Sequence, residues 1–312
     1  MLGVITPLEM IVGKEKWITI CSVNWYSCVY LRVLFANLLS KAGCKEALKL
    51  LVIDNTNGND KLLYELLREY PLEIIKNDPG NLTGSYGHAS GLNTAMNNIA
   101  TQYGLIVDPD VYVFKKNWDL FLIDLLDKEQ AVAAGVAYPA WQLGKYHNFP
   151  SPVFCFFHSK QFGMLNPDWA PFEGKKNARI WDFIRRNILR GGIIINRKAY
   201  EKSSVMRKIG TRLEKVIGVC SKDTGWINAK KAAEREVKAI TFQTLVKDAK
   251  NVNERFRNLA DHFELYMHED KPILAHKYSS AGKLWSTQKG RDDVYWRKCI
   301  TQAEAARDFW RS

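Results

Sequence analysis

Short apolar runs alternate with segments of helical periodicity along the first half of the chain. They predict strands over residues 17–23, 48–53, 72–76, 103–107 and 131–137, and helices over 31–41, 60–70, 88–100 and 117–126. Strands separated by helices form βαβ units, so we expect an α/β fold with a mostly parallel sheet. In such a sheet the ligand binds beyond the C-terminal ends of the strands.

Polar residues follow three of these predicted strands at the point where each apolar run ends. They are Ser22, Asn24, Asp54, Asn55, Asp108 and Asp110. Because neighbouring parallel strands end at the same edge of a sheet, we expect these side chains to gather there. The sequence therefore places its candidate chemistry at one edge of the sheet.

The second half of the chain is less regular. Residues 138–171 are rich in aromatic residues and proline and show no long periodic run. Farther on, the pattern predicts helices over 179–190, 223–236 and 292–310 and strands over 191–196 and 273–275. No linker-like composition divides the chain, so we expect one fused unit.

Composition and charge narrow the class of protein. The 312 residues are 46% hydrophobic and 25% charged, which excludes wholesale disorder. Six cysteines without a Cys-x-x-Cys pair, and a start that lacks a signal-peptide pattern, favour the cytoplasm. Residues 1–156 carry 13 Lys/Arg and 15 Asp/Glu, whereas residues 157–312 carry 32 and 18. The basic second half favours an anionic partner: a nucleoside diphosphate, an anionic membrane surface or a nucleic acid.

Two carboxylates flank a proline directly after the predicted strand over 103–107. Asp108 and Asp110 point to the same side if the chain stays extended, and Pro109 stiffens the corner. Such a pair can ligate Mg²⁺ or Mn²⁺, which take oxygen ligands and keep substrate phosphates in their shell. A strand-to-turn corner without a ligand is the alternative interpretation.

Four segments occur in an order that resembles the GT-A glycosyltransferases, and family 2, the rhamnosyltransferase-like branch, in particular. They are ITICSVNWYS, LLVIDNTNGND, YGHASGLNTAM and LIVDPDV, over residues 17–135, with a thinner similarity that reaches SKDTGWINAKK near residue 230. The resemblance implies a GT-A (Rossmann-like) sheet flanked by helices. It also implies a nucleotide-sugar-binding half over 1–137 and an acceptor-binding and catalytic half over 138–290. The helical spacing at the end of the chain predicts a C-terminal amphipathic helix over 291–312.

The same resemblance implies the activity: metal-dependent, inverting transfer of a sugar from a nucleoside-diphosphate sugar to an acceptor hydroxyl. The acceptor would be a glycan or a lipid-linked glycan, and the cofactor Mn²⁺ or Mg²⁺. In the family, the positions of Ser22 and Asn24 contact the nucleotide, and that of Asp54 bonds the base. The positions of Asp108 and Asp110 bind the metal, with Asp110 the closer ligand.

A glycine-rich helix start in YGHASGLNTAM matches the part of the family pattern that leaves room for the nucleotide sugar. The matching residues are Gly87, Ala89 and Asn93, with Asn55 and His88 as further candidates for donor contacts. His88 is unusual for the pattern, so its role stays open. Turn chemistry at Asp54 and Asn55 and close helix packing at Gly87 and Ala89 are the structural alternatives.

The general base is expected at Asp223, which looks like the second residue of the family's Glu-Asp pair and would take a proton from the acceptor hydroxyl. Lys222 replaces the usual Glu, a departure from the pattern, and Asp223 could equally be a helix N-cap. Glu173 and Asp182 are the reserve candidates. His276, after a short apolar run, is the candidate third metal ligand.

Competing assignments remain open at several positions. His262 and His268 compete with His276, and Trp141 and Trp169 are candidates for stacking on an acceptor sugar. The tail over 294–310 could lie on a membrane surface, or pack on its own domain or on a second subunit. A nucleic-acid-binding protein and a nucleotidyltransferase are the alternative functions. Nucleic acid is disfavoured as a partner because the basic residues are dispersed along the chain. A nucleotidyltransferase is disfavoured because no Gly-rich basic loop follows the first strand.

Overall fold

The computed structural model describes residues 16–171, 200, 203–219, 224–245, 252–277 and 292–306. The strands are β1 (Ile18–Asn24), β2 (Leu48–Asp54), β3 (Leu72–Lys76), β4 (Tyr103–Val107), β5 (Val111–Val113), β6 (Ala133–Val136), β7 (Phe154–His158), β8 (Ala239–Thr244), β9 (Glu264–His268) and β10 (Lys271–His276). The helices are α1 (Cys28–Lys41), α2 (Lys61–Glu65), α3 (Ser85–Met96), α4 (Trp118–Glu129), α5 (Ser159–Gly163), α8 (Ser204–Ile217), α9 (Trp226–Glu234), α10 (Glu254–His262) and α11 (Asp293–Ala306), with short 3-10 turns η2 (Lys45–Ala47) and η3 (Leu66–Arg68). The α/β class and the early strands agree with the sequence pattern.

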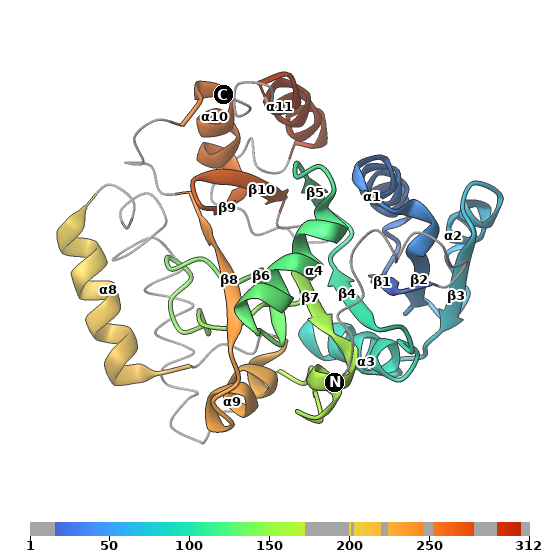
Figure 1. The fold of residues 1–312 in the computed structure, drawn as a ribbon, viewed down its shortest axis with the longest axis horizontal. Coiled ribbons are helices and arrows are strands. Elements are labelled where there is room, and N and C mark those ends of the chain that lie inside the picture. Colours follow the sequence, from blue (N-terminus) through green and yellow to red (C-terminus); the bar gives the residue numbers. More distant parts are fainter. Residues whose placement is uncertain are drawn as a thin grey trace.

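The strands form one ten-stranded sheet in the order β3-β2-β1-β4-β7-β6-β8-β9-β10-β5 (Figure 1). The pairs β3–β2, β2–β1, β1–β4 and β6–β8 are parallel, whereas the other five pairs are antiparallel. The expectation of a mostly parallel sheet was therefore wrong beyond β4, and the sheet is mixed.

Strand β7 explains much of that difference. It comes from the aromatic segment in which the sequence showed no long periodic run, and it lies antiparallel between β4 and β6. Four of its five residues are buried, so both of its faces are apolar and no alternation marks it as a strand. The strand also joins the two predicted parts of the chain, 1–137 and 138–290, in a single sheet.

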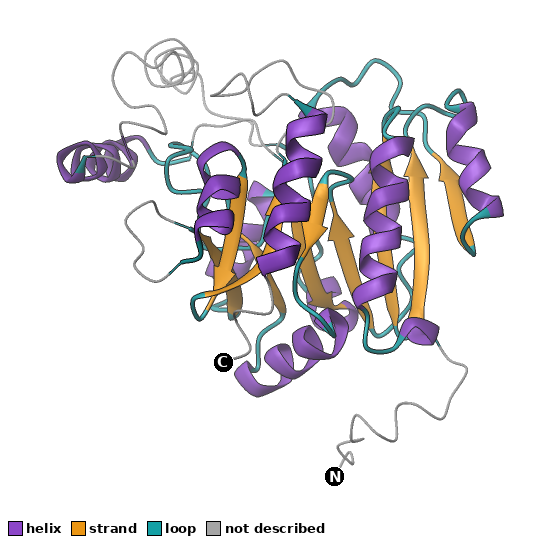
Figure 2. Ribbon diagram, turned by 90° about the horizontal axis from the view of Figure 1, so that it is seen from above, coloured by secondary structure: helices purple, strands orange, loops and turns teal. Residues whose placement is uncertain are grey.

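Helices cover both faces of the sheet (Figure 2). Alternate residues of β1 serve the two faces: Ile18 and Ile20 pack with residues of α1 and α4, whereas Cys21 and Val23 pack with residues of α3. This two-residue period is what a strand buried on both sides requires. The polar ends of β1, β2 and β4 are thereby kept at one edge of the sheet.

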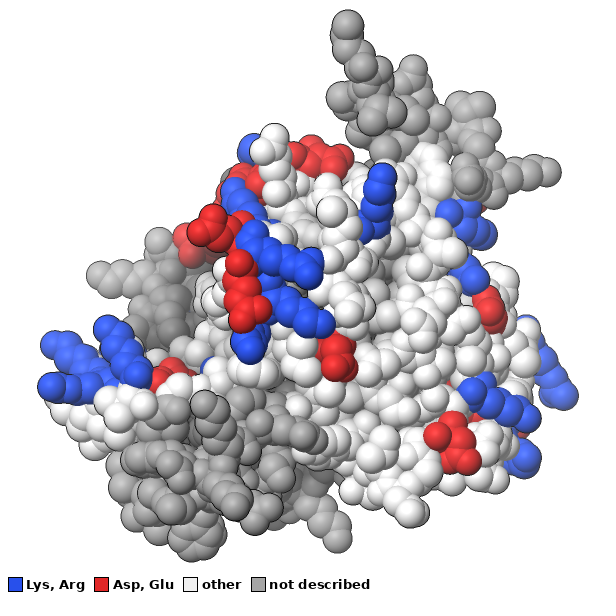
Figure 3. All heavy atoms as spheres, turned by 90° about the horizontal axis from the view of Figure 1, so that it is seen from below, with Lys and Arg blue, Asp and Glu red and all other residues white. Residues whose placement is uncertain are grey.

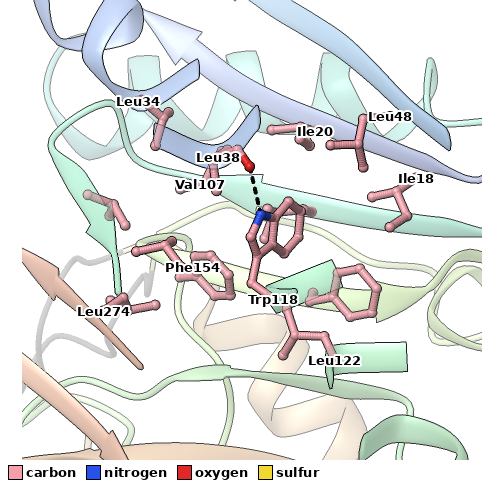
Figure 4. Packing of buried hydrophobic residues seen from close by; sticks show 14 of the residues in the cluster. Ile18, Ile20, Leu34, Leu38, Leu48, Val107, Trp118, Leu122, Phe154 and Leu274 are labelled. Atoms are coloured by element: carbon pink, nitrogen blue, oxygen red, sulfur yellow. Dashed lines mark hydrogen bonds between the residues drawn. The ribbon is translucent and has the colours of Figure 1, made fainter. Parts of the chain in front are cut away.

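Trp118 fixes the layer formed by α1 and α4. Its indole is buried among Val107, Phe154 and Leu274, and its Nε1–H donates to the carbonyl of Leu38 at 2.9 Å (Figure 4). A buried indole N–H needs such a partner. The contact ties α4 to the end of α1, and its neighbours belong to β4, β7 and β10.

Helix α11 confirms the predicted C-terminal helix and shows where its apolar side lies. Trp296, Cys299 and Ile300 are buried, in a cluster with Phe256 and Leu259 of α10. The helix packs on its own domain, so these apolar residues do not face a membrane. Within the described ranges, no helix has both the length and the apolar character that a membrane crossing demands.

Candidate metal centre and nucleotide site

The corner after β4 meets the end of β10. Strand β4 ends at Val107, and β5 begins at Val111, so Asp108 and Asp110 lie on the short turn between them. Strand β5 pairs antiparallel with β10, in a register that sets His276 opposite Val111. Residues more than 160 positions apart in sequence are brought to one place by this pairing.

Asp108, Asp110 and His276 converge there. The Nε2 atom of His276 lies 3.3 Å from Asp110 Oδ1 and 3.8 Å from Asp108 Oδ2. One ligand atom from each residue lies within 4.8 Å of the others. Asp110 and His276 are buried, whereas the Asp108 side chain is 20% exposed. Two carboxylates and one imidazole are a donor set that fits Mn²⁺ or Mg²⁺, with the nitrogen favouring Mn²⁺.

Glu264 completes this cluster, and the sequence pattern did not identify it. Its Oε2 lies 2.9 Å from Nδ1 of His276 and accepts from the hydroxyl of Tyr266 at 2.9 Å. Its Oε1 accepts from Gln142 Nε2 at 2.8 Å. Register pairs Glu264 with His276 across the β9–β10 hairpin. The signal that the sequence offered for Glu264 was an acidic residue directly before the apolar run Leu265–Met267.

Charge and burial compete in this cluster. Burial alone would lower the pKa of His276, but the carboxylates of Asp110 and Glu264 outweigh it and hold that pKa well above its ordinary value. Burial raises the pKa of Asp108, although His88 and His276 act in the opposite direction. The carboxylates of Asp110 and Glu264 thus stabilise the charged form of the His276 imidazole.

His88 lies beside the same corner. Its Nε2 is 3.5 Å from Asp108 Oδ1, and its ring is partly exposed. His88 lies in the first turn of α3, the helix that follows the loop after β3. The two competing histidines lie elsewhere: His268 makes an edge-to-face contact with Phe121, and His262 makes one with Tyr295. Among the described residues, the histidines near the carboxylate pair are therefore His276 and His88.

Asn24 and Asp54 form the centre of a hydrogen-bonded turn at the ends of β1 and β2. Asn24 Nδ2 donates to Asp54 Oδ1 at 3.2 Å and to Asp60 Oδ2 at 3.1 Å. Asp54 also accepts from the Thr56 and Gly58 backbone, with further bonds from the Thr56 and Tyr64 hydroxyls. Both residues are fully buried. The structure thus gives Asp54 the turn role that was its structural alternative in the sequence. Contact of Asn24 or Asp54 with a nucleotide stays a prediction.

Ser22, Asn55 and Gly87 hold α3 and β4 against the first strands. The Ser22 hydroxyl donates to the carbonyl of Val107 at 2.8 Å. Asn55 Nδ2 donates to the carbonyl of Gly87 at 2.8 Å. A Cβ at Gly87 would lie 3.0 Å from the carbonyl oxygen of Leu82. Close packing, the structural alternative for Gly87, is therefore present.

Asn93 of α3 forms hydrogen bonds with Asp168 and Trp169, in the segment that follows α5. It donates to Asp168 Oδ1 at 3.1 Å and accepts from the Trp169 backbone N–H at 2.9 Å. Trp169 is fully buried and packs against Phe162. Its candidacy as a stacking surface for an acceptor sugar was therefore wrong: an indole in the core of the protein cannot contact a substrate. Trp141 is partly buried.

The three candidate general bases, Asp223, Glu173 and Asp182, lie outside the described residues. Thr224, directly after Asp223, is buried, and its carbonyl accepts from the hydroxyl of Tyr146 at 3.0 Å. Gly225 follows with φ +90°, and its N–H donates to the carbonyl of Trp169. Helix α9 begins immediately afterwards, so the chain is anchored directly after residue 223.

No protein-family model and no curated protein matches the chain. Solved structures do. The mannosyltransferase PcManGT from Pyrobaculum calidifontis, in complex with GDP-Man and Mn²⁺, is 12% identical with a TM-score of 0.40, over 50% of this chain and 48% of that one. TarS 1–349 from S. aureus, in complex with UDP, is 14% identical with a TM-score of 0.38, over 49% and 50%.

A third similar structure is mouse xyloside xylosyltransferase 1 in its apo form. It is 12% identical with a TM-score of 0.39, over 73% of this chain and 84% of that one. The chain thus spans about half the length of the first two structures that it matches. At this level the similarity concerns part of the fold, and the assignment of function depends on the site itself.

Proposed function

We propose that the chain is a metal-dependent, inverting glycosyltransferase of the GT-A type. It transfers a sugar from a nucleoside-diphosphate sugar to a hydroxyl of a glycan or a lipid-linked glycan, as in polysaccharide biosynthesis. The finer family assignment is the rhamnosyltransferase-like branch of family 2. The observation that carries the proposal is the convergence of Asp108, Asp110 and His276 at the end of β4. This is the edge of an α/β sheet at which ligands bind.

The chemistry that we propose assigns a separate task to each group. Asp108, Asp110 and His276 hold the divalent cation, which when bound neutralises charge on the diphosphate. Asp223 accepts the proton of the acceptor hydroxyl. The acceptor oxygen then forms a bond to the anomeric carbon from the face opposite the diphosphate. The bond from that carbon to the phosphate oxygen breaks, and its electron pair leaves with the nucleoside diphosphate.

Calorimetry with UDP, GDP and dTDP, each with and without Mn²⁺, tests the donor side of the proposal. We expect binding of at least one nucleotide that requires Mn²⁺. Asp110→Asn keeps the shape of the side chain but removes a ligand charge, so nucleotide affinity with Mn²⁺ should fall about 10- to 100-fold. Asp124→Asn, on the exposed side of α4, is the matched control and should bind as the wild type does.

The outcomes separate this proposal from its alternatives. Metal-independent nucleotide binding, or equal affinities for Asp110→Asn and wild type, would remove the metal site from the proposal. Tight binding of nucleic acid without affinity for any nucleoside diphosphate would instead support a nucleic-acid-binding protein. The two results are measured on the same preparation by the same method.

A second experiment addresses the general base. Asp223→Asn should reduce turnover on the order of a thousandfold while donor affinity stays within about twofold, because a general base acts on the acceptor. Loss of donor binding in that variant would assign Asp223 to structure. Glu173→Gln and Asp182→Asn, measured in parallel, then identify the alternative base by the same pattern of lost turnover and retained affinity.

A further inference from the structure

Helix α8 has one side that packs on the protein and one that does not. It begins at Ser203, whose hydroxyl accepts from the N–H of Met206 at 3.3 Å, and ends before Gly218 with φ +68°. Met206 and Leu213 pack against Leu143 on the inward side. This inward contact fixes which side of the helix is turned outward. Figure 1 shows α8 at the left margin of the fold.

Aliphatic side chains line the outward side. Val205, Ile209 and Val216 are 59%, 40% and 76% exposed. Their spacings of four and seven residues put them on one stripe along the helix. The stripe covers eleven residues of rise, or roughly 16 Å. Exposure of three aliphatic residues in one line, rather than singly, indicates a contact surface.

Basic side chains run along the edge of this stripe. Lys208, Arg212 and Lys215 are exposed, and none forms an ion pair with another residue that the structure describes. The single acidic residue of α8, Glu214, turns inward, where its Oε1 lies 2.9 Å from Nε2 of His147 and accepts from the N–H of Gly144. Figure 3 shows Lys and Arg side chains gathered at the left edge of the molecule, the side on which Figure 1 places α8.

We propose that the outward side of α8 docks on an anionic lipid bilayer. The outward side consists of Val205, Lys208, Ile209, Arg212, Lys215 and Val216. A helix with an aliphatic stripe and an adjoining row of cations lies in the plane of a membrane, the stripe among the acyl chains and the cations among the headgroups. Helix α8 lies at the margin of the fold, so its outward side can meet a flat surface (Figure 1).

The same features disfavour other polyanions. Single strands of nucleic acid are bound by aromatic platforms, and the outward side of α8 carries none. The proposal is also independent of the transferase activity, since vesicle binding is measured without donor, metal or acceptor. It differs from the membrane contact considered for residues 294–310, where Trp296, Cys299 and Ile300 of α11 are buried in the protein.

Vesicle co-sedimentation of the full chain tests the proposal. We expect binding to phosphatidylcholine vesicles that contain about 30% phosphatidylglycerol, weak binding to pure phosphatidylcholine, and release by salt. The triple variant Lys208→Ala, Arg212→Ala, Lys215→Ala should lose on the order of 10- to 100-fold in partition coefficient. A second variant, Val205→Ser with Val216→Ser, should lose on the order of tenfold with the charge unchanged.

A control of equal charge loss separates a specific surface from general attraction by the basic chain. Lys128→Ala, Lys160→Ala, Lys298→Ala removes three exposed cations from other helices and should bind nearly as the wild type does. Equal loss in both triple variants, no effect of the serine variant, or wild-type binding that ignores phosphatidylglycerol would each overturn the proposal. All substituted side chains are exposed, and circular dichroism checks that the fold is retained.

A dye reports which side of α8 enters the bilayer. An environment-sensitive fluorophore on Ile209→Cys should shift to shorter wavelength when anionic vesicles are added. The same dye on Thr211→Cys, exposed on another side of the helix, should shift much less. The unsubstituted protein, treated with dye, gives the background from its own cysteines. Equal shifts at both positions would contradict the orientation and with it the proposal.

Discussion

The imidazole of His276 lies between Glu264 and Asp110, with one ring nitrogen facing each carboxylate. Nδ1 is 2.9 Å from Glu264 Oε2, and Nε2 is 3.3 Å from Asp110 Oδ1. A carboxylate that accepts from Nδ1–H leaves Nε2 with its lone pair toward the aspartates, and it also increases the basicity of that nitrogen. Glu264 is thereby a positioning residue for a ligand.

Replacement of Glu264 by Gln should weaken Mn²⁺ binding about 10- to 100-fold. The amide oxygen can still accept from Nδ1–H, so the ring keeps its orientation, but the negative charge that polarises it is gone. Titration of Mn²⁺ followed by electron paramagnetic resonance, without nucleotide, measures this affinity directly. Gln142, which donates to Glu264, should matter less because its removal leaves the carboxylate charged.

Glu129→Gln is the matched control for that titration. Glu129 also pairs with a cationic group, Lys238, but at the exposed surface. The control should bind Mn²⁺ as the wild type does. An unchanged Mn²⁺ affinity in Glu264→Gln, with the fold intact by circular dichroism, would show that Glu264 contributes only to packing.

The sequence predicted the first four strands well because each is an apolar run that ends in polar residues. It also predicted that Asp108 and Asp110 would lie at a strand end, and it proposed His276 as their partner. It could not predict that β5 pairs with β10, which is the pairing that brings His276 to the corner. Strand β5 has three residues, too few for any period to appear.

Residues whose role depends on a partner far along the chain were the ones that sequence reasoning missed. Glu264 is one, because its contact with His276 depends on the register that sets the two residues opposite each other in β9 and β10. Asp60 is another: it stands at the N-cap position of α2, yet its side chain accepts from Asn24 and caps no backbone N–H. Long-range hydrogen bonds of this kind leave no periodic trace in the sequence.

Gly91 allows α3 to approach β1 and β2, and Gly91→Ala should therefore destabilise the protein. A Cβ there would lie 2.7 Å from Asn55 Oδ1 and 2.8 Å from Val23 Cγ1. Overpacking of this kind costs about 1–3 kcal/mol in the free energy of unfolding. Denaturant titration gives the value. Gly163→Ala, where a Cβ meets nothing within 4 Å, is the control and should be neutral or slightly stabilising. Equal stabilities for the two variants would refute the tight approach.

The pair of His147 and Glu214 should make stability depend on pH. Burial alone would lower the pKa of His147, but Glu214 outweighs it and raises the pKa above its ordinary value. The imidazolium therefore stabilises the fold fully below pH of about 6.5, and this contribution is lost as the pH rises through the raised value. Glu214→Gln should cost about 0.5–1 kcal/mol near pH 6 and less near pH 9.

Thermal unfolding of Glu214→Gln and wild type across that pH range tests the linkage. Glu234→Gln is the control, because Glu234 pairs with Lys230 on the exposed side of α9 and no histidine takes part. Its difference from wild type should therefore stay flat between pH of about 6 and 9. A difference for Glu214→Gln that is equally flat would mean that His147 stays neutral in the folded protein.

Asp54 gives a test that separates a structural role from a donor contact. Its two carboxylate oxygens accept hydrogen bonds from Asn24, Thr56, Gly58 and Tyr64. In Asp54→Asn, the side-chain NH₂ group replaces one of these oxygens and cannot accept from the donors that face it. Loss of such buried bonds costs about 1–3 kcal/mol in the free energy of unfolding. Burial acts to raise the pKa of Asp54, but these bonds lower it, so its contribution is present above the unfolded pKa and is lost on acidification. If Asp54 also bonds the base, UDP affinity of the folded variant should fall about tenfold; a destabilised variant with unchanged nucleotide affinity would confine Asp54 to the turn.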